Sequence, residues 1–342
     1  MFKINKSVEL VTATIKSLSS MGRESRLGAK TALERRYKHV RITDIRSISD
    51  LDELVARQPD LAFLGMKFIY DNSQSQPKRV WISEYLSAAG IAYTGSGQNA
   101  SMLEHNKLLS KNAVAGRGLR TARSKLIKQG EAYTEGDIDI TYPIFIKPVD
   151  GGGGSGINDR SLVQNFDELR AQVEWLLDNC RTDALLEAYI PGREYSVGIL
   201  KKRFSDGFHM LPLEIIAPVN RTGSRFLSKS VKLSDSEQTL EVTDSVIREK
   251  INPLAFGAFE ALRAEDYGRI DIRLDKSGEP HFLEANLLPS LLDNYGNLPK
   301  AAKLNIGLDH NQLIHKIAEL GLAKSERLQA DSLGSRVSRV SP

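Results

Sequence analysis

Two short stretches near the end of the chain decide the fold. Residues 268–274 read GRIDIRL, and residues 281–286 read HFLEAN. Both alternate polar and apolar side chains with the period of two that half-buried β-strands show. Between them, residues 277–278 (Ser-Gly) form a candidate two-residue hairpin turn. We therefore predict an antiparallel β-hairpin over residues 268–286.

The predicted register places polar side chains directly opposite one another. Counted outward from the turn, Asp271 lies opposite Glu284, and Arg269 lies opposite Asn286. Two facing carboxylates repel by a few tenths to about 1 kcal/mol unless a cation lies between them. Aspartate, glutamate and asparagine offer the oxygen ligands that Mg²⁺ prefers. The hairpin therefore predicts a magnesium site, with a solvated polar face carrying an Arg–Asp pair as the alternative.

The other face of the predicted hairpin is apolar, and we expect it to face the core. It carries Ile270, Ile272, Leu283 and Ala285. This assignment depends on the register, because a slip of one residue would move one strand's polar set to the core face.

A glycine-rich loop follows another predicted strand. Residues 142–147 read YPIFIK and end in Lys147, and residues 150–156 read DGGGGSG. Backbone N–H groups in such a loop can cradle phosphate oxygens, and Lys147 would add a positive charge there. The loop also matches G-x-G-x-x-G, but helical periodicity starts only near Phe166, which disfavours a nicotinamide site. No Walker A sequence follows the glycines, and the apolar flanks argue against a flexible linker.

A third segment could contact a nucleotide. Residues 185–194, LLEAYIPGRE, predict a strand, a turn and a second strand. Glu187 could accept a hydrogen bond from an adenine amine, and Glu194 could bind ribose hydroxyls. Taken alone, each of these residues also fits an ordinary surface carboxylate.

The first part of the chain alternates short apolar strands with helical stretches. Residues 61–65 and 91–94 are predicted strands, and residues 80–90 a helix that ends at a glycine. This alternation predicts an α/β layer with a parallel sheet. A capping box, SMLE, opens a predicted helix over residues 101–114, so we expect a subdomain boundary near residue 98.

Two later segments are polar and lack periodicity. Residues 217–237 contain Gly, Ser and Asn, and a loop of that length inside a compact domain is usually functional or disordered. Residues 324–342 hold few large apolar side chains. We therefore predict a disordered tail there.

Composition and charge disfavour several classes of protein. The 342 residues are 41% hydrophobic and 26% charged, which suits a globular protein of two or three subdomains. A net charge of +4 among 47 basic and 43 acidic side chains predicts no nucleic-acid partner. No run of ~18 apolar residues and no signal-peptide pattern occurs, so we expect no membrane partner. The single cysteine, Cys180, permits no intrachain disulfide and fits a cytoplasmic location.

Taken together, these segments resemble the ATP-grasp superfamily and, within it, the D-alanine–D-alanine ligase-like group. The similarity spans roughly residues 60–322, and its specific part is the Gly-Arg-Ile-Asp and Leu-Glu-Ala-Asn pair of the hairpin. The other matching segments are residues 103–107, 146–148, 187–194 and 228–229.

The resemblance implies an ATP-grasp fold, α/β overall and α+β in the ATP-binding part, with ATP held between two α+β lobes. Three subdomains follow from it. They are an N-terminal α/β domain over residues 1–98, a central lobe with the glycine loop over 99–190 and a C-terminal lobe with the metal site over 191–323. The disordered tail would occupy residues 324–342.

The resemblance also implies which residues bind ATP. Three lysines would contact the phosphates or close over them: Lys107, Lys147 and Lys229. The glycine loop would contribute Gly153, Gly154 and Ser155. Glu187 and the backbone around Ile190 would hold adenine, and Glu194 the ribose.

The implied reaction is the ligation of a small-molecule carboxylate to a small-molecule amine. ATP would activate the carboxylate as an acyl phosphate, and the products would be an amide, ADP and phosphate. Asp271, Glu284 and Asn286 would bind two Mg²⁺ ions, or Mn²⁺ in their place. Arg269 would stabilise the acyl phosphate and the tetrahedral intermediate, and Lys229 would act in the closing loop. Dimers are common in that group, so the resemblance leaves a homodimer open, and the sequence itself does not determine the oligomeric state.

The chain departs from the group's pattern where the amino-acid substrates would bind. A Ser-Ser-Val run becomes Gly-Gly-Ser at residues 153–155, and Lys-Tyr becomes Lys-Ser at 229–230. Leu-His-Gly becomes Leu-Gly-Met at 64–66, and Asn-Thr-x-Pro-Gly becomes Asn-Leu-Leu-Pro-Ser at 286–290. The Ser-x-Glu-x-x-Val-Ser run is only faintly echoed by Gly-Arg-Glu-Ser at 22–25. We therefore predict that D-alanyl-D-alanine is not the product.

Three alternatives stay open beside the carboxylate–amine ligase. The first is a true D-alanine–D-alanine ligase with degenerate motifs. The second is a regulatory protein that binds ATP without turnover. The third is a glycine-loop kinase, which would release a phosphorylated product without an amine.

Overall fold

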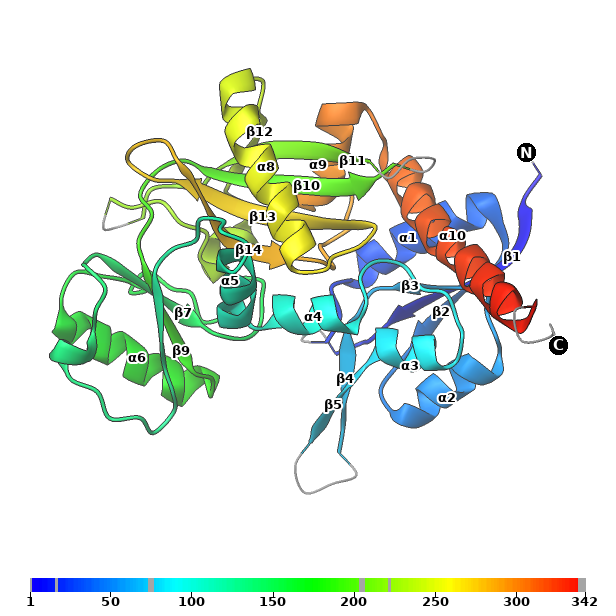
Figure 1. Ribbon diagram of the computed structural model, residues 1–342, viewed down its shortest axis with the longest axis horizontal. Helices are drawn as coiled ribbons and strands as arrows, with labels where there is room; N and C mark the ends of the chain where they lie inside the picture. Colours follow the sequence, from blue (N-terminus) through cyan, green and yellow to red (C-terminus); the bar gives the residue numbers. More distant parts are fainter. Residues whose placement is uncertain (1, 16–17, 73–76, 203–206, 221–222, 338–342) are drawn as a thin grey trace.

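The computed structural model describes residues 2–15, 18–72, 77–202, 207–220 and 223–337. Its strands form three sheets and a separate two-stranded hairpin (Figure 1). The sheets follow one another along the chain, with strand orders β2-β1-β3, β6-β9-β7-β8 and β12-β11-β10-β13-β14. Each sheet falls within one predicted subdomain, although the boundaries between subdomains stay a prediction.

The N-terminal sheet is parallel, as the alternation of strands and helices predicted. Strand β1 (Ile4–Thr12) lies between β2 (Tyr37–Asp44) and β3 (Leu61–Leu64) and pairs in parallel with both. Helices α1 (Arg23–Arg36) and α2 (Ile48–Ala56) make the crossovers. The carboxyl ends of β1 and β3 therefore lie side by side, at the point where the strand order reverses.

The segment after β3 differs from the expectation. Strands β4 (Phe68–Asp71) and β5 (Lys78–Trp81) form a hairpin, and α3 (Ile82–Ala88) begins only after it. The predicted helix over 80–90 therefore starts two residues late, because Val80 and Trp81 pair with β4. The predicted strand over 91–94 makes only a single bridge, Tyr93 to Ala62.

The helix predicted over residues 101–114 is broken in two. Helix α4 (Gln98–His105) ends before Asn106, and α5 (Lys107–Ala115) begins after it. Asn106 is extended and caps α5, because its side chain accepts a hydrogen bond from the Leu109 N–H at 3.0 Å. The break leaves the Lys107 N–H to donate to Val149 O at 2.8 Å, which ties α5 to the strand before the glycine loop.

The central lobe has a hydrophobic core of its own (Figure 1, green). Its elements are β6 (Ser124–Ile127), the 3₁₀ turn η1 (Glu135–Asp137), β7 (Ile144–Pro148), β8 (Leu162–Val163), α6 (Phe166–Cys180) and β9 (Ala184–Ala188). Helix α6 buries Leu169, Val173 and Leu176 against the sheet. The helical periodicity expected to start near Phe166 is thereby confirmed.

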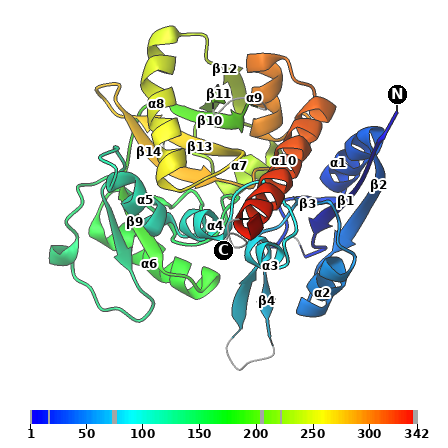
Figure 2. The ribbon, with the colours of Figure 1, turned by 45° about the vertical axis from the view of Figure 1, so that its right-hand side comes forward.

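The C-terminal lobe is an antiparallel five-stranded sheet covered by helices. Its strands are β10 (Glu194–Lys201), β11 (Phe208–Ile216), β12 (Gln238–Glu241), β13 (Tyr267–Leu274) and β14 (Pro280–Asn286). Its helices are α7 (Lys229–Ser234), α8 (Ser245–Ala261) and α9 (Asn297–Ile306), and α10 (His310–Val337) follows them (Figure 2). The core of this lobe includes Ala100 of α4 and Val114 of α5, so both helices pack on this lobe.

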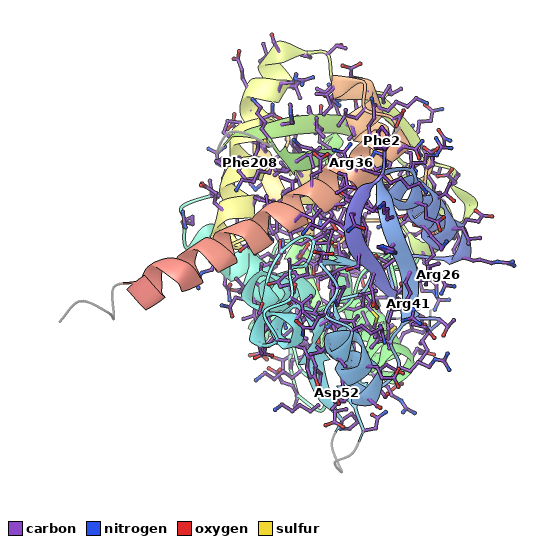
Figure 3. All side chains as sticks on the ribbon, turned by 90° about the vertical axis from the view of Figure 1, so that its right-hand side faces the viewer. Phe2, Arg26, Arg36, Arg41, Asp52 and Phe208 are labelled. Atoms are coloured by element: carbon purple, nitrogen blue, oxygen red, sulfur yellow. The ribbon has the colours of Figure 1, made fainter. Side chains whose placement is uncertain are left out.

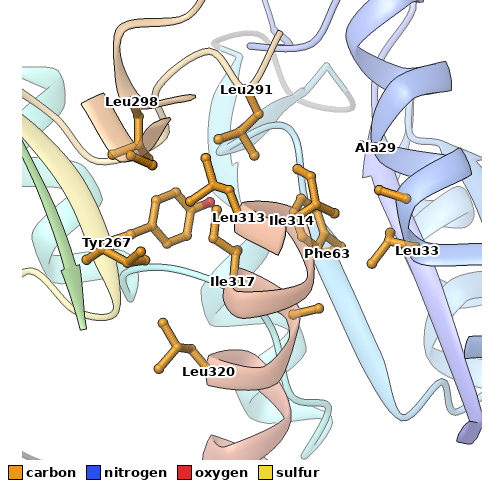
Figure 4. Close-up of a cluster of buried hydrophobic side chains, with 14 of the residues drawn as sticks. Ala29, Leu33, Phe63, Tyr267, Leu291, Leu298, Leu313, Ile314, Ile317 and Leu320 are labelled. Atoms are coloured by element: carbon orange, nitrogen blue, oxygen red, sulfur yellow. The ribbon is translucent and has the colours of Figure 1, made fainter. Parts of the chain in front are cut away.

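The N-terminal domain and the C-terminal lobe share one core (Figure 4). Leu33 and Phe63 from the N-terminal domain meet Leu313 and Ile317 of α10, and Tyr267 of β13 completes the cluster. These two parts therefore form one body, whereas the central lobe has a separate hydrophobic core.

The structure differs from the disordered tail that was predicted over residues 324–342, because most of these residues are helical. Helix α10 continues to Val337 and projects from the body in Figure 3. Lys324 anchors it, because its Nζ lies 2.7 Å from a carboxylate oxygen of Glu265 and 2.8 Å from one of Asp266. A count of large apolar residues cannot detect such an anchor. Residues 338–342 of the predicted tail lie outside the described residues.

Candidate active site

The acidic hairpin has the predicted register at the residues that matter. In β13 and β14, Asp271 lies opposite Glu284, and Arg269 lies opposite Asn286. The turn is different, since the Asp275 N–H donates to Glu279 O at 2.9 Å across a longer loop. The register at the site is kept because the ladder shifts by one residue after Asp271, as a β-bulge does.

Because of the same bulge, Leu283 does not lie on the core face of the hairpin, where it was predicted. Past the shift, Ile272 pairs with Phe282, whose side chain is fully buried in the core of the lobe. Leu283 turns to the other side and lines a cleft together with Glu284. The sequence placed Leu283 in the core because strict alternation cannot reveal an extra residue in one strand.

Asp271 and Arg269 are held in place by hydrogen bonds. Asp271 accepts from the Ser196 hydroxyl of β10 at 2.7 Å and from Arg269 Nη2 at 2.9 Å. Burial lowers the pKa of Arg269, but Asp271 and Glu284 raise it more, so the guanidinium stays charged. Its Nε is buried and has no hydrogen-bond partner among the described residues, which leaves one donor for a ligand.

Glu284 is an anion in a positive surrounding. Burial raises its pKa, but Lys232, Lys147 and Lys107 outweigh that effect and lower the pKa to about 2. The carboxylate is therefore ionised at neutral pH, as a metal ligand must be.

Asn286 completes the predicted oxygen set. It is half-buried opposite Arg269, and its Oδ1 accepts a hydrogen bond from the Leu288 N–H at 3.2 Å. No three His, Cys, Asp or Glu side chains converge on one point in the described part of the chain. Two carboxylates and an amide are thus what this face of the hairpin can offer to a hard cation.

Lys147 lies in the site, but it is paired. Its Nζ is 3.0 Å from one oxygen of Glu187, and Lys111 Nζ is 3.0 Å from the other. All three side chains are buried. Both oxygens of Glu187 therefore face lysines, and its predicted adenine contact stays a prediction. Sequence reasoning missed Lys111, although its position four residues after Lys107 puts both lysines on one side of α5.

Lys107 lies against the glycine loop. Its buried Nζ donates to Gly151 O at 2.7 Å, and burial lowers its pKa. Gly154 has a positive φ of 76° and lies against the start of α7, where a β-carbon would come within 3.3 Å of the Lys229 nitrogen. Gly153 and Ser155 are exposed. The loop thus lies over the cleft's edge, next to residues 223–237, which we name the covering segment.

The lysine of the covering segment that lines the cleft is Lys232, and the role expected for Lys229 stays a prediction. Ser228 caps the short helix α7, and Lys229 follows it with an exposed side chain. One turn later, Lys232 lines the cleft beside Glu284 and Glu194. The Tyr295 hydroxyl donates to Lys232 O at 2.9 Å and so holds the backbone at this point. A sequence motif cannot tell which of two lysines, three residues apart, faces inward.

The cleft lies between the central lobe and the C-terminal lobe. One part of its wall is apolar, formed by Phe145, Ile157, Phe226 and Leu283. Residues 188–192, which we name the hinge, include the predicted adenine contact at Ile190. The hinge lines the cleft through Ala188, Tyr189 and Ile190. The rest is charged and contains Lys147, Lys232, Asp271 and Glu284. An apolar slot that continues into a charged end fits a nucleobase followed by phosphates.

Glu194, which was predicted to bind the ribose, lines the cleft. It faces Arg273 across β10 and β13, with the Arg273 Nε 3.8 Å from its carboxylate. Burial raises the pKa of Glu194, Arg273 lowers it, and Asp271 and Glu284 raise it again. Arg273 also donates to the carbonyls of Gly192 and Arg225, which links the hinge to the covering segment.

Comparison with known proteins identifies the family. Residues 116–319 match the family model for the D-ala D-ala ligase C-terminus. The chain belongs to the D-alanine–D-alanine ligase family. It is 30% identical to a D-alanine–D-alanine ligase of Bordetella petrii, over 80% of this chain and 79% of the relative. Identity to one of Geobacter sulfurreducens is 29%, over 78% of this chain and 79% of the relative.

Solved structures of this ligase family have the same fold. A D-alanine–D-alanine ligase of Bacillus anthracis complexed with ATP has a TM-score of 0.73 at 20% identity, over 95% of this chain and 99% of that one. The VanG D-Ala:D-Ser ligase of Enterococcus faecalis has a TM-score of 0.69 at 21% identity, over 93% and 99%. The ATP-grasp fold and the ADP-forming carboxylate–amine ligase activity expected from the sequence are thereby confirmed.

Proposed function

We propose that this ligase binds ATP in the cleft between the lobes, with the base against Leu283 and the hinge and the phosphates at Lys147, Lys107 and Lys232. The observation that supports this most directly is Glu284, an ionised carboxylate opposite Asp271 and beside three lysines. A site built only for a metal would not need the lysines, and one built only for an anion would not need the carboxylates. Both are needed where metal-bound phosphates lie.

Asp271, Glu284 and Asn286 would hold the Mg²⁺ that the reaction requires, as two ions or with Mn²⁺ in their place. Their oxygen atoms and the low pKa of Glu284 fit this ion. Bound there, Mg²⁺ would offset the charge that develops during phosphoryl transfer. The side chains around it supply the rest of the positive charge.

Arg269 would act on the carboxylate substrate. Its guanidinium is fixed by Asp271 and keeps the buried Nε as a free donor toward a ligand. A donor fixed in this way would stabilise the acyl phosphate and the oxyanion formed when the amine attacks. The covering segment would keep water from the acyl phosphate, with Lys232 carried into the cleft by α7.

We also propose that the product differs from D-alanyl-D-alanine. The relatives named above are D-alanine–D-alanine ligases, but the Leu-His-Gly pattern expected from that group is Leu64-Gly65-Met66 here. A β-carbon on Gly65 would lie 2.9 Å from the Met21 sulfur and 3.1 Å from Val11 O, so a histidine there would require Met21 to move. This difference from the group's pattern supports a product other than D-alanyl-D-alanine.

A substrate screen tests the proposal. The enzyme is incubated with ATP, Mg²⁺ and pairs of amino acids or dipeptides, ADP release is recorded, and hits are analysed by mass spectrometry. An amide product other than D-alanyl-D-alanine is expected. D-alanyl-D-alanine as the best product would restore the narrower alternative, and a phosphorylated product that forms without an amine would indicate a kinase.

Two expectations from the sequence stay predictions. These are the homodimer and the cytoplasmic location. No helix in the described residues is long and apolar enough to cross a bilayer.

A further inference from the structure

A buried lysine that no motif singled out lies beside the ATP site. Lys111 is on α5, its side chain is 1% exposed, and it does not line the cleft. Its Nζ lies 3.0 Å from Glu187 and donates to the Thr121 hydroxyl at 3.1 Å. A fully buried charge is costly unless it has a partner, so this lysine requires an explanation.

Glu187 joins two lysines that belong to different parts of the molecule. Lys147 is on β7 of the central lobe, as Glu187 is on β9, whereas Lys111 belongs to α5, which packs on the C-terminal lobe. The Nζ–carboxylate distance is 3.0 Å on both sides. Two positive charges therefore share one negative charge, and this triad spans the boundary between the lobes.

Lys111 is fixed to the body by a second contact. The Thr121 hydroxyl that accepts from Lys111 donates in turn to Phe282 O at 3.1 Å. Phe282 lies on β14, two residues before Glu284. Lys111 is thus tied to the strand that carries Glu284, whereas Lys147 lines the cleft, where a ligand can reach it.

Glu187 and the phosphates of a bound ATP would compete for Lys147. In this structure Lys147 is held by Glu187. Phosphates that attract Lys147 would leave a buried carboxylate with one partner fewer, and removing one partner of a buried ion pair is strongly unfavourable. Lys111 removes most of this cost, because it keeps Glu187 paired after Lys147 has moved.

We propose that Lys111 is a positioning residue that lets Glu187 exchange Lys147 for the nucleotide base. When ATP binds, Lys147 turns from Glu187 to the phosphates, and the freed oxygen of Glu187 accepts a hydrogen bond from the amino group of the base. Lys111 stays on the other oxygen throughout. The inference rests on the proposed ATP site, but its test measures binding and is independent of turnover.

The test is equilibrium binding of Mg-ATP by calorimetry to the wild type and to Lys111→Met. A methionine keeps the volume and removes the charge. We expect the Kd for ATP to rise about tenfold, because Glu187 then retains Lys147. A second substitution, Glu187→Gln on the Lys111→Met background, releases Lys147 and should bring the Kd back to within about threefold of the wild type.

A second readout separates this role from a merely structural one. Purine riboside triphosphate lacks the 6-amino group that Glu187 would bind. The wild type should prefer ATP over this analogue by about tenfold, and Lys111→Met should lose most of that preference. A destabilised but otherwise normal site would weaken both ligands equally.

Clear outcomes would overturn the proposal. A folded Lys111→Met protein with a Kd for ATP within about twofold of the wild type would do so, as would a double variant no better than the single one. If Lys111→Met does not fold, Thr121→Val loosens Lys111 without removing its charge. An unchanged Kd and unchanged base preference in Thr121→Val would then count against the proposal.

Discussion

The hairpin β13–β14 and the covering segment supply opposite charges to one cleft, but they are built differently. Strand β13 pairs with β10 on one side and β14 on the other, and Asp271 adds hydrogen bonds to Ser196 and Arg269. The covering segment carries Lys232 on a helix of six residues. Its contacts include the Lys229 N–H to Ile157 O at 3.3 Å and the Tyr295 hydroxyl to Lys232 O.

The difference indicates that the hairpin and the covering segment have different roles in the proposed site. Carboxylates that bind a metal must be in place before the ligand arrives, and a central strand provides that rigidity. A lysine that covers the phosphates must move aside to admit ATP, and a short helix with few contacts can open at low cost. Substitution of Asp271 or Glu284 should therefore abolish most of the turnover, whereas substitutions in the covering segment should lower it by smaller amounts.

The largest effect is expected at Glu284. Replacing it with glutamine removes one charge from the metal site and leaves an amide of the same size. Turnover should fall about a thousandfold with little change in melting temperature, because the loss is confined to the transition state. The matched control is Glu279→Gln, at a half-buried residue beside the turn that pairs with Lys250 and Arg120, and it should stay within about twofold of the wild type. Equal effects in both variants would contradict the metal assignment.

The second comparison is between the two lysines of α7. Lys232→Met should lower turnover by ten- to about a hundredfold, because one cation near the phosphates is lost. Lys229→Met should change it by less than about threefold, since this side chain is exposed. Steady-state ADP release with each variant decides between them, and a larger loss in Lys229→Met would restore the assignment made from the sequence.

A smaller effect should follow from loosening the covering segment at its anchor. Tyr295→Phe removes the hydrogen bond to Lys232 O, worth about 1 kcal/mol, so kcat/KM for ATP should fall by roughly fivefold. Limited trypsin digestion should cut faster within the covering segment, and saturating ATP should restore protection. Tyr70→Phe, at an exposed tyrosine of β4, is the control. An unchanged digestion rate would show that Tyr295 does not hold the segment.

The smallest effect is expected on stability, at His105, the last residue of α4 before the break that precedes Lys107. Burial, together with Arg79, Lys67 and Lys107, lowers the pKa of His105 to about 4 from the usual 6.5. The unfolded chain therefore takes up this proton first, and stability is lost as the pH falls from 6.5 toward 4. After allowance for partial exposure the loss should be about 1 to 2 kcal/mol.

Urea unfolding at pH 7.5 and pH 5 measures this loss. His105→Phe, which suits the neighbouring rings of Phe68 and Trp81, should show a smaller difference between the two pH values than the wild type. His39→Gln, at an exposed histidine, should keep the wild-type difference. An unaltered acid response in His105→Phe would assign the loss to other groups.

Much of the hairpin could be predicted because strand alternation and facing acids are local properties. Asp271 and Glu284 were paired correctly even though the turn was wrong, since the bulge after Asp271 restores the count. Leu283 could not be assigned to the cleft for the same reason. Lys147 and the glycine loop were found from a strand followed by glycines, whereas Lys111 carries no such signal and is defined only by what it meets in space.

The sequence by itself determined the elements of the acidic hairpin, the charges and the family. The period of two in β13 and β14, the glycine loop and the strand–helix alternation depend on neighbours along the chain. Only the tertiary structure decided which lysine of α7 faces inward, that Glu187 is held between Lys147 and Lys111, and that α10 is anchored at Lys324. These contacts join elements distant in sequence, and the packing that selects them comes from the whole fold.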